Sequence, residues 1–242
     1  MNEVEYTERP YKPRTIFWNV DTQYDFMRSD ESFKGALAVP GARGIEKRLE
    51  HLTRIADRRY IPIVNTADWH TPKSKEISAT PDYVTTFPPH CMQGTQGAEY
   101  IPATMPGNRR SGGKMTIVEW DRTEPLDPEE IAESLDVIIH KDLFDAFAGN
   151  KHTDEIVKIL NPYTAFVYGV ATNYCVTHAV DGLVKRGVEV YVVKDAVKEI
   201  PFPGEPDATF KRWSDAGVKF IDTKDIELLW KDLPPLDTSH LN

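Results

Sequence analysis

Residues 164–178 read TAFVYGVATNYCVTH, an apolar run that passes directly into a helical pattern. The run is short and β-prone, and apolar residues then recur at helical spacing from Ala179 to Val184. This order predicts a buried strand, a tight turn and a helix capped by Thr172 or Asn173. Cys175 then lies just inside a helix N-terminus, where free amide groups and the helix dipole favour a thiolate. The alternative is a small, inert buried cysteine.

The same alternation of apolar runs and helical patterns extends along the chain. Six strands are predicted, at residues 15–20, 61–66, 137–139, 164–170, 188–193 and 218–221. Helices are predicted at residues 45–56, 153–160, 206–216 and 225–229, besides the one after Cys175. Strands that alternate with helices predict an α/β fold, with a mainly parallel sheet flanked by helices on both faces. Residues 67–120 are rich in Pro and Gly, and a loop region of that length is usually functional.

Length and composition predict one domain and exclude several kinds of partner. We expect a single domain over residues 15–232, preceded by a polar arm (1–14) and followed by a tail (233–242). The net charge of −9 argues against nucleic acid and against an anionic membrane surface. No apolar run is long enough to span a bilayer or resembles a signal peptide. Two cysteines fit a reducing compartment, so we expect a cytoplasmic protein.

Polar side chains follow four of the predicted strands. Asp21 follows the first strand, Asp68 and His70 the second, Lys141 the third and Cys175 the fourth. Since the carboxyl ends of parallel strands meet at one edge of the sheet, these side chains are predicted to converge there.

The convergence of Asp21, Lys141 and Cys175 would support nucleophilic catalysis. The thiol needs a proton acceptor, which a carboxylate can be, and the lysine keeps that carboxylate ionised. Attack on an amide would release ammonia or an amine and form a thioester, which water would hydrolyse. The backbone amides of Ala171 and Cys175 could hold the oxyanion. Taken singly, Asp21 could instead be a strand-end cap and Lys141 a solvated charge.

A second cluster has the composition of a metal site. In the extended run Asp68-Trp69-His70 the alternate side chains share a face, and His90, which follows two prolines, could be a third ligand. Glu76 could be a fourth. One carboxylate and two imidazoles suit one divalent ion, with zinc as the first choice and iron or manganese as alternatives. The other interpretation is that these are histidines of a surface loop.

Taken together, these motifs resemble those of the nicotinamidases, within the isochorismatase-like cysteine hydrolases. The matching stretches are DTQYDF (21–26), ADWH (67–70), FPPHCMQGTQGAE (87–99), Lys141 and GVATNYCV (169–176). They occur in the family's order between residues 15 and 200. Asp142 follows the lysine where many members have Gly, and Phe87 stands where many have Trp.

The resemblance implies an isochorismatase-like fold and specific roles for several residues. It implies a catalytic triad of Asp21, Lys141 and Cys175, and a metal held by Asp68, His70 and His90. The ring nitrogen of nicotinamide would dock against that metal. A cis peptide would join Val170 to Ala171. Three aromatic residues would wall a flat substrate slot, although they could equally be ordinary core aromatics: Phe26, Trp69 and Phe87.

The activity that follows is hydrolysis of nicotinamide to nicotinic acid and ammonia, a step of NAD salvage. One alternative is a related hydrolase of another small amide, such as a carbamoyl or ureido compound. Another is a non-catalytic metal-binding scaffold. The expected partners are a small amide and further copies of the chain in a homo-oligomer. Cys91 is interpreted as structural, and residues 102–136 receive no assigned role.

Overall fold

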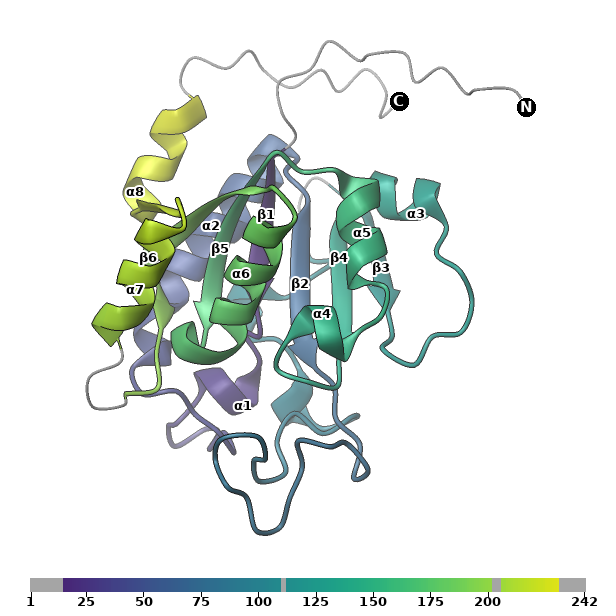
Figure 1. Cartoon of the computed structure of the whole chain (residues 1–242), viewed down its shortest axis with the longest axis vertical. Coiled ribbons are helices and arrows are strands. Elements are labelled where there is room, and N and C mark those ends of the chain that lie inside the picture. The colour runs from purple at the N-terminus through teal and green to yellow at the C-terminus, as the bar shows by residue number, and fades with distance from the viewer. Residues whose placement is uncertain (1–14, 110–111, 202–205, 231–242) are drawn as a thin grey trace.

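The structure is a computed structural model that describes residues 15–109, 112–201 and 206–230. Within these ranges, seven strands form one sheet in the order β3-β4-β2-β1-β5-β6-β7 (Figure 1). Every neighbouring pair is parallel, as the sequence predicted. The strands are β1 (Thr15–Val20), β2 (Ile63–Asp68), β3 (Lys114–Val118), β4 (Ser134–Lys141), β5 (Thr164–Val170), β6 (Glu189–Lys198) and β7 (Lys219–Ile221).

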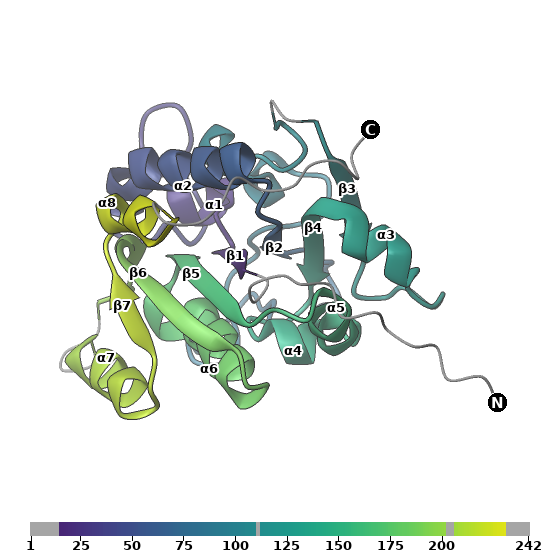
Figure 2. The same ribbon diagram turned by 90° about the horizontal axis from the view of Figure 1, so that it is seen from above.

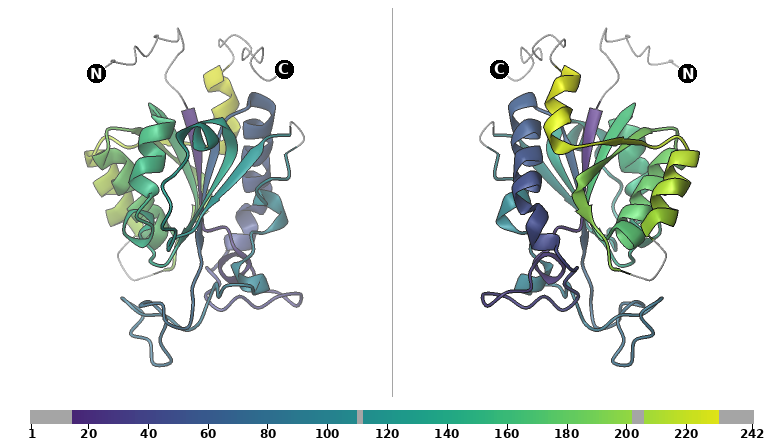
Figure 3. Two further views of the ribbon diagram at one scale, coloured as in Figure 1. Left: turned by 90° about the vertical axis from the view of Figure 1, so that its right-hand side faces the viewer. Right: turned by 90° about the vertical axis from the view of Figure 1, so that its left-hand side faces the viewer.

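Helices cover both faces of the sheet, as Figures 2 and 3 show. One face carries α1 (Tyr24–Met27), α2 (Glu46–Arg59) and α8 (Thr223–Ile226); the other carries α4 (Ala146–Gly149), α5 (Thr153–Leu160), α6 (Thr177–Lys185) and α7 (Pro206–Asp215). The short α3 (Pro128–Glu133) packs through Ile131 into the same core as α5. Single turns lie at Ala42–Ile45 (η1), Gln96–Ala98 (η2), Pro102–Thr104 (η3), Thr172–Val176 (η4) and Glu227–Trp230 (η5).

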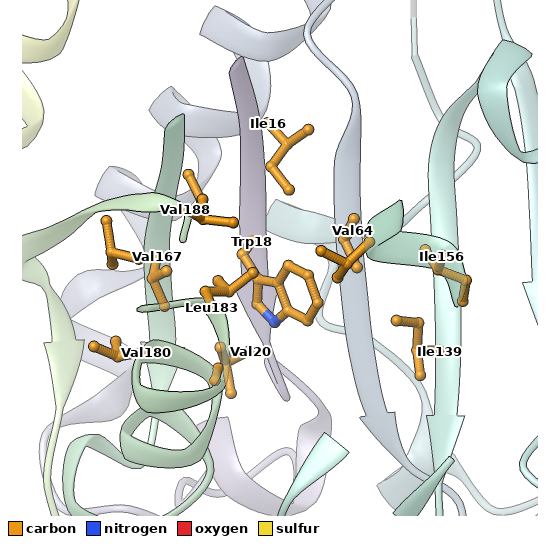
Figure 4. Close-up of a cluster of buried hydrophobic side chains, with 14 of the residues drawn as sticks. Ile16, Trp18, Val20, Val64, Ile139, Ile156, Val167, Val180, Leu183 and Val188 are labelled. Atoms are coloured by element: carbon orange, nitrogen blue, oxygen red, sulfur yellow. The ribbon is translucent and has the colours of Figure 1, made fainter. Parts of the chain in front are cut away.

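The central strand β1 is buried on both faces, which explains why its sequence is apolar apart from Thr15 and Asn19. On one face, Trp18 packs among residues of β2, β5 and α6 such as Val64, Val167 and Leu183 (Figure 4). On the opposite face, Phe17 packs with the apolar side of α2. Because successive side chains of a strand point to opposite faces, these two neighbours belong to two separate cores.

The order of the strands places a topological switch point between β1 and β5. The chain runs from β1 to β2 and β4 on one side, and then crosses to β5, β6 and β7 on the other. Clefts in open α/β sheets form at such a point, beyond the carboxyl ends of the strands. Asp21 directly follows β1, and Cys175 lies in the turn after β5. The fold therefore brings these two residues to the same place.

Several predicted elements need correction. The region predicted as one long loop contains β3, and the helices α3 and α4 were not predicted. The strand β3 lies at an edge of the sheet and exposes Met115 and Ile117, so it lacks the continuous apolar run of a central strand. The strands β2 and β4 extend further than predicted, so that Asp68 and Lys141 are their last residues and not the residues that follow them.

The predicted arm (1–14) and tail (233–242) lie outside the described residues, as does the end of the predicted domain at 231–232. Residues 102–136, which received no role, contribute η3, β3 and α3 to one edge of the fold. Among the helices that the structure describes, none combines the length and hydropathy needed to cross a bilayer.

Candidate active site

Asp21 occupies a fixed position at the end of β1. Its backbone lies in the left-handed region (φ 47°), and its amide donates to the carbonyl of Thr66 at 3.1 Å. The hydroxyl of Thr66 donates to Asp21 Oδ1 at 2.6 Å. Its side chain is fully buried. These contacts orient Oδ2 toward Lys141, whose Nζ lies 2.9 Å away.

Lys141 joins the two groups of candidate site residues. It ends β4 in direct register with Asp68 of β2, so the two side chains lie on the same face of the sheet. Its Nζ donates to Asp68 Oδ1 and lies 3.8 Å from Cys175 Sγ. The lysine is only 1% exposed. One buried ammonium group thus contacts both carboxylates and the thiol.

Cys175 lies in the η4 turn, just beyond the end of β5. The peptide bond between Val170 and Ala171 is cis, as the family resemblance implied. The predicted side-chain cap was wrong, because the turn starts after Ala171 and no side chain caps it. The side chain of Asn173 instead bonds the backbone of Ile200, donating to its carbonyl at 2.8 Å and accepting from its amide at 3.1 Å. The turn is therefore fastened to the segment after β6.

The electrostatics of the thiol differ from the prediction. Burial raises the pKa of Cys175 well above its usual value, Lys141 opposes this rise, and Asp21 and Asp68 reinforce it. Burial also raises the pKa of Asp21, with Lys141 opposing. For Lys141, burial alone would lower the pKa, but the two carboxylates raise it well above its usual range. The arrangement therefore favours a neutral thiol beside a proton acceptor and a permanent positive charge.

Three possible metal ligands converge next to this cluster. The ligand atoms of Asp68, His70 and His90 all lie within 4.8 Å of one another, and all three residues are buried. Asp68 Oδ2 is 3.7 Å from His70 Nε2 and 3.6 Å from His90 Nε2. Ligands of a tetrahedral zinc ion lie about 2 Å from the metal and hence about 3.3 Å from each other. Small movements of the three side chains would therefore bring their ligand atoms to the distances that one bound ion requires.

The hydrogen bonds of the two imidazoles support this interpretation. His90 Nδ1 must be protonated, since it bonds the carbonyl of Pro88 at 2.8 Å, and this leaves Nε2 with a free lone pair. The Nε2 atom of His70 is buried and has no hydrogen-bond partner among the residues that the structure describes. A buried polar atom without a partner is costly, and a cation would satisfy it. The donor set and the unpartnered nitrogen fit a divalent metal.

Glu76 also faces this group. Its Oε2 lies 4.0 Å from His70 Nε2, and its Oε1 accepts the backbone amide of Phe144 at 2.8 Å. Burial and the nearby Asp68 raise the pKa of Glu76 to about 7. Glu76 thus contacts His70 but lies outside the compact group of Asp68, His70 and His90. The other acidic group, formed by Asp21, Asp68 and Cys175, is different because the ammonium of Lys141 contacts all three members.

The three predicted slot aromatics have different ring neighbours. Phe26 and Phe87 both contact the candidate ligand His90, with ring centroids 5.5 and 6.1 Å from its ring. Trp69 instead stacks on His140, with centroids 4.2 Å apart. Along the extended run from Asp68 to His70 the middle side chain points away from its neighbours, which explains this placement.

Sequence reasoning missed two aromatic residues beside the site. The ring of Tyr174, which precedes Cys175, lies 5.8 Å from that of Phe87 and 6.4 Å from that of Phe144. An aromatic wall therefore continues from His90 past the turn that carries the thiol. The position of Tyr174 directly before Cys175 could have indicated that its ring lies beside the site. Nothing in the sequence indicated Phe144.

Gln23 was also missed as a structural support of the site. It is fully buried, and its amide nitrogen donates to the carbonyls of Asp68 and Ala98 at 2.7 and 2.8 Å. Its oxygen accepts the amide of Asp68 at 2.9 Å. Gln23 therefore links the end of β2 to the loop that follows His90. The position of Gln23 in the motif that begins at Asp21 could have indicated this role.

Comparison with known proteins agrees with this geometry. Residues 15–225 match the Isochorismatase domain. The chain belongs to the isochorismatase family. The nicotinamidase/pyrazinamidase of Mycobacterium tuberculosis is 28% identical over 185 residues, which cover 73% of this chain and 82% of that protein. The nicotinamidase of Saccharomyces cerevisiae is 26% identical over 214 residues, 79% of this chain and 90% of that one.

The fold is shared with solved members of the isochorismatase family. The pyrazinamidase of Pyrococcus horikoshii, solved in complex with zinc, superposes with a TM-score of 0.63 and 26% identity. The match covers 87% of this chain and 99% of that structure. Family membership and these relatives identify the chain as an isochorismatase-like hydrolase and indicate an amidohydrolase.

Proposed function

We propose that the protein is a metal-dependent nicotinamidase that hydrolyses nicotinamide to nicotinic acid and ammonia. The observation that carries the proposal is the contact of Lys141 with both Asp21 and Cys175, directly beside the group of Asp68, His70 and His90. The names of the relatives from M. tuberculosis and S. cerevisiae support nicotinamide as the substrate.

We also propose that the ion is zinc, bound by the three protein ligands Asp68, His70 and His90, with the carboxylate of Glu76 next to His70. The zinc complex of the P. horikoshii pyrazinamidase supports this assignment. When bound, the ion would supply positive charge and an open coordination position for the ring nitrogen of the substrate. Phe26 and Phe87, which both contact His90, would hold the flat ring.

In the first half of the reaction, Asp21 takes the proton of the Cys175 thiol as sulfur attacks the carboxamide carbon. The oxyanion that forms would lie near the backbone amides of Ala171 and Cys175. Asp21 then returns the proton to the departing nitrogen, ammonia leaves, and the acyl group remains on sulfur as a thioester. Lys141 stays charged throughout and compensates the negative charge that moves between oxygen and sulfur.

In the second half, water attacks the thioester carbon and gives its proton to Asp21. The tetrahedral intermediate collapses, the carbon–sulfur bond breaks, and the proton on Asp21 returns to the thiolate. Nicotinic acid is released and the free thiol is restored. The raised pKa of Cys175 agrees with this cycle, since the thiol is neutral between turnovers and loses its proton only as it attacks.

The decisive experiment measures ammonia release from nicotinamide by the purified, zinc-loaded protein. Cys175→Ala should abolish turnover, and removal of the metal by a chelator should suppress it until zinc is returned. Cys91→Ala is the matched control. That thiol is also fully buried, and burial also raises its pKa well above the usual value, but it lies against the carbonyl of Gly97 at 3.7 Å. Cys91→Ala should retain activity.

A panel of other small amides separates nicotinamidase activity from a related amidase activity. Turnover of a carbamoyl or ureido compound with no turnover of nicotinamide would reject the proposed substrate and keep the nucleophile. A zinc-loaded protein that hydrolyses no amide in the panel would reject the enzymatic proposal altogether.

A further inference from the structure

The turn that follows β4 contacts two of the candidate metal ligands. Asp142, the residue after Lys141, has its Oδ1 atom 3.3 Å from His70 Nδ1. Two residues later, the backbone amide of Phe144 donates to Glu76 Oε1 at 2.8 Å. The strand β4, which supplies Lys141, thus continues into a segment that contacts His70 and Glu76.

The contact with Asp142 fixes the tautomer of His70. A carboxylate can only accept, so His70 Nδ1 must carry the hydrogen and Nε2 must carry the lone pair. That Nε2 is the buried nitrogen without a hydrogen-bond partner, and it faces Asp68 Oδ2. His70 is fully buried, whereas the side chain of Asp142 is 19% exposed. Asp142 therefore approaches His70 from the outside, opposite the side on which an ion would bind.

Backbone contacts hold the turn that carries Asp142 in place. The amide of Asp142 donates to the carbonyl of Gly149 at 3.2 Å. A Cβ atom at Gly149 would lie 2.7 Å from the nitrogen of Leu143, so the two segments are in direct backbone contact. Asp145 then caps α4 by accepting the amide of Phe147 at 2.9 Å. The position of Asp142 is thus set by the backbone and not by its own side chain.

We propose that Asp142 is a positioning residue of the metal site, which orients the imidazole of His70 and increases its basicity toward a bound divalent cation. The proposal rests on the metal site of the proposed function. Carboxylates that accept the second N–H of a ligating histidine typically change metal affinity by about 10- to 100-fold. The side chain contacts neither the thiol cluster nor the aromatic wall in any bond or ring contact of the described residues, so its effect should be confined to metal binding.

The test measures zinc affinity of the full-length protein by competition with a chromophoric chelator. Asp142→Asn and Asp142→Ala should each weaken binding by about 10- to 100-fold. Asp154→Asn is the matched control, because it removes the same charge from an exposed ion pair with Arg186. The melting temperature of each metal-free variant is measured in parallel, since a merely structural role would lower it without changing zinc affinity.

Wild-type affinity for zinc in Asp142→Asn and Asp142→Ala overturns the inference and leaves the nicotinamidase proposal intact. If Asp142→Ala fails to fold, Asp142→Asn, which keeps the size of the side chain, decides alone. If the variants lose zinc affinity but the wild-type protein hydrolyses no nicotinamide, the inference stands and the substrate is wrong. A wild-type protein that binds no zinc overturns both.

Discussion

At the scale of single residues, the buried charge of Lys141 determines the chemistry. A lone buried ammonium would lose its proton or destabilise the fold, because the desolvation of an ion costs several kcal/mol. Asp21 and Asp68 offset that cost through contacts with the same Nζ. The carboxylate of Asp21 also interacts with the thiol of Cys175, whereas Asp68 keeps its second oxygen for the two imidazoles.

Asp21→Asn separates proton transfer from metal binding. The substitution keeps the shape of the side chain but removes the acceptor of the thiol proton, so we expect kcat to fall by about 10²- to 10⁴-fold. Zinc affinity should change less than kcat, because Asp21 does not belong to the group of Asp68, His70 and His90. Initial rates of ammonia release and a zinc titration test this. Asp121→Asn, at an exposed loop position, should change neither quantity. Turnover above a tenth of wild type would contradict the assigned role.

At the scale of elements, the site depends on the close approach of β1 and β5. Val20 and Gly169 are register partners, and Gly169 has a φ of 119°. A Cβ atom there would lie 2.1 Å from the carbonyl oxygen of Val20. Only glycine allows this approach, which brings the turn with Cys175 beside Asp21.

Gly169→Ala should therefore lower the free energy of unfolding by more than about 3 kcal/mol, because strain and a backbone clash add together. Gly187→Ala is the matched control: its φ is also positive (79°), but nothing lies within 4 Å of the added carbon. The control should lose only about 1–2 kcal/mol. Urea denaturation measures both. If both variants lost the same free energy of unfolding, the close approach of β1 and β5 would not restrict residue 169 to glycine.

The buried ion pair of Arg109 and Asp136 also links elements of the fold. Arg109 Nε donates to Asp136 Oδ2 at 3.0 Å, and their side chains are 3% and 5% exposed. Arg109 also donates to the carbonyls of Ile61 and Leu135, at 3.0 and 2.6 Å. The guanidinium therefore fastens the segment before β3 to the start of β4 and to the residues before β2.

Arg109→Met should destabilise the protein by about 3–5 kcal/mol, because it leaves the carboxylate of Asp136 buried without its charge partner. Arg54→Met, which breaks an exposed pair with Glu50 within α2, should cost less than about 1 kcal/mol. Equilibrium denaturation measures the free energy of unfolding of both variants. A loss in Arg109→Met no larger than that in Arg54→Met would show that the pair does not anchor this edge.

At the scale of the whole molecule, two hydrophobic cores hold the sheet, and the polar groups collect at one end of it. The strand ends of β1, β2 and β4 and the turn after β5 supply Asp21, Asp68, Lys141 and Cys175. The segment after β2 extends beyond these strand ends and carries His70 and His90 (Figure 1). The ligands converge in the folded structure, so metal binding should stabilise the folded state.

Zinc should therefore raise the melting temperature. At a free concentration of 100 Kd, linkage predicts about 2.7 kcal/mol of added stability, which for a chain of this size corresponds to a rise of about 5–10 °C. Differential scanning calorimetry with and without zinc measures the shift. His70→Ala should show little shift. An equal shift in this variant would place the bound zinc elsewhere on the protein.

The sequence alone determined the α/β class, the parallel sheet and the identity of the converging residues. Buried parallel strands are continuous apolar runs, and polar residues at their ends stand out against them. The pattern did not identify β3, because an edge strand is only partly buried, nor the exact ends of β2 and β4. Boundaries depend on pairing with neighbouring strands, which the sequence of one segment does not contain.

Only the tertiary structure decided the electrostatics and the orientation of the side chains. Sequence reasoning predicted a stabilised thiolate at Cys175, but burial beside two carboxylates raises the pKa of that thiol. It did not foresee that Trp69 stacks on His140. It could not foresee that Asp142 reaches His70 or that His70 Nε2 lacks a partner. Residue types are encoded locally, whereas distances between charges and the solvent they lose arise only when distant segments pack together.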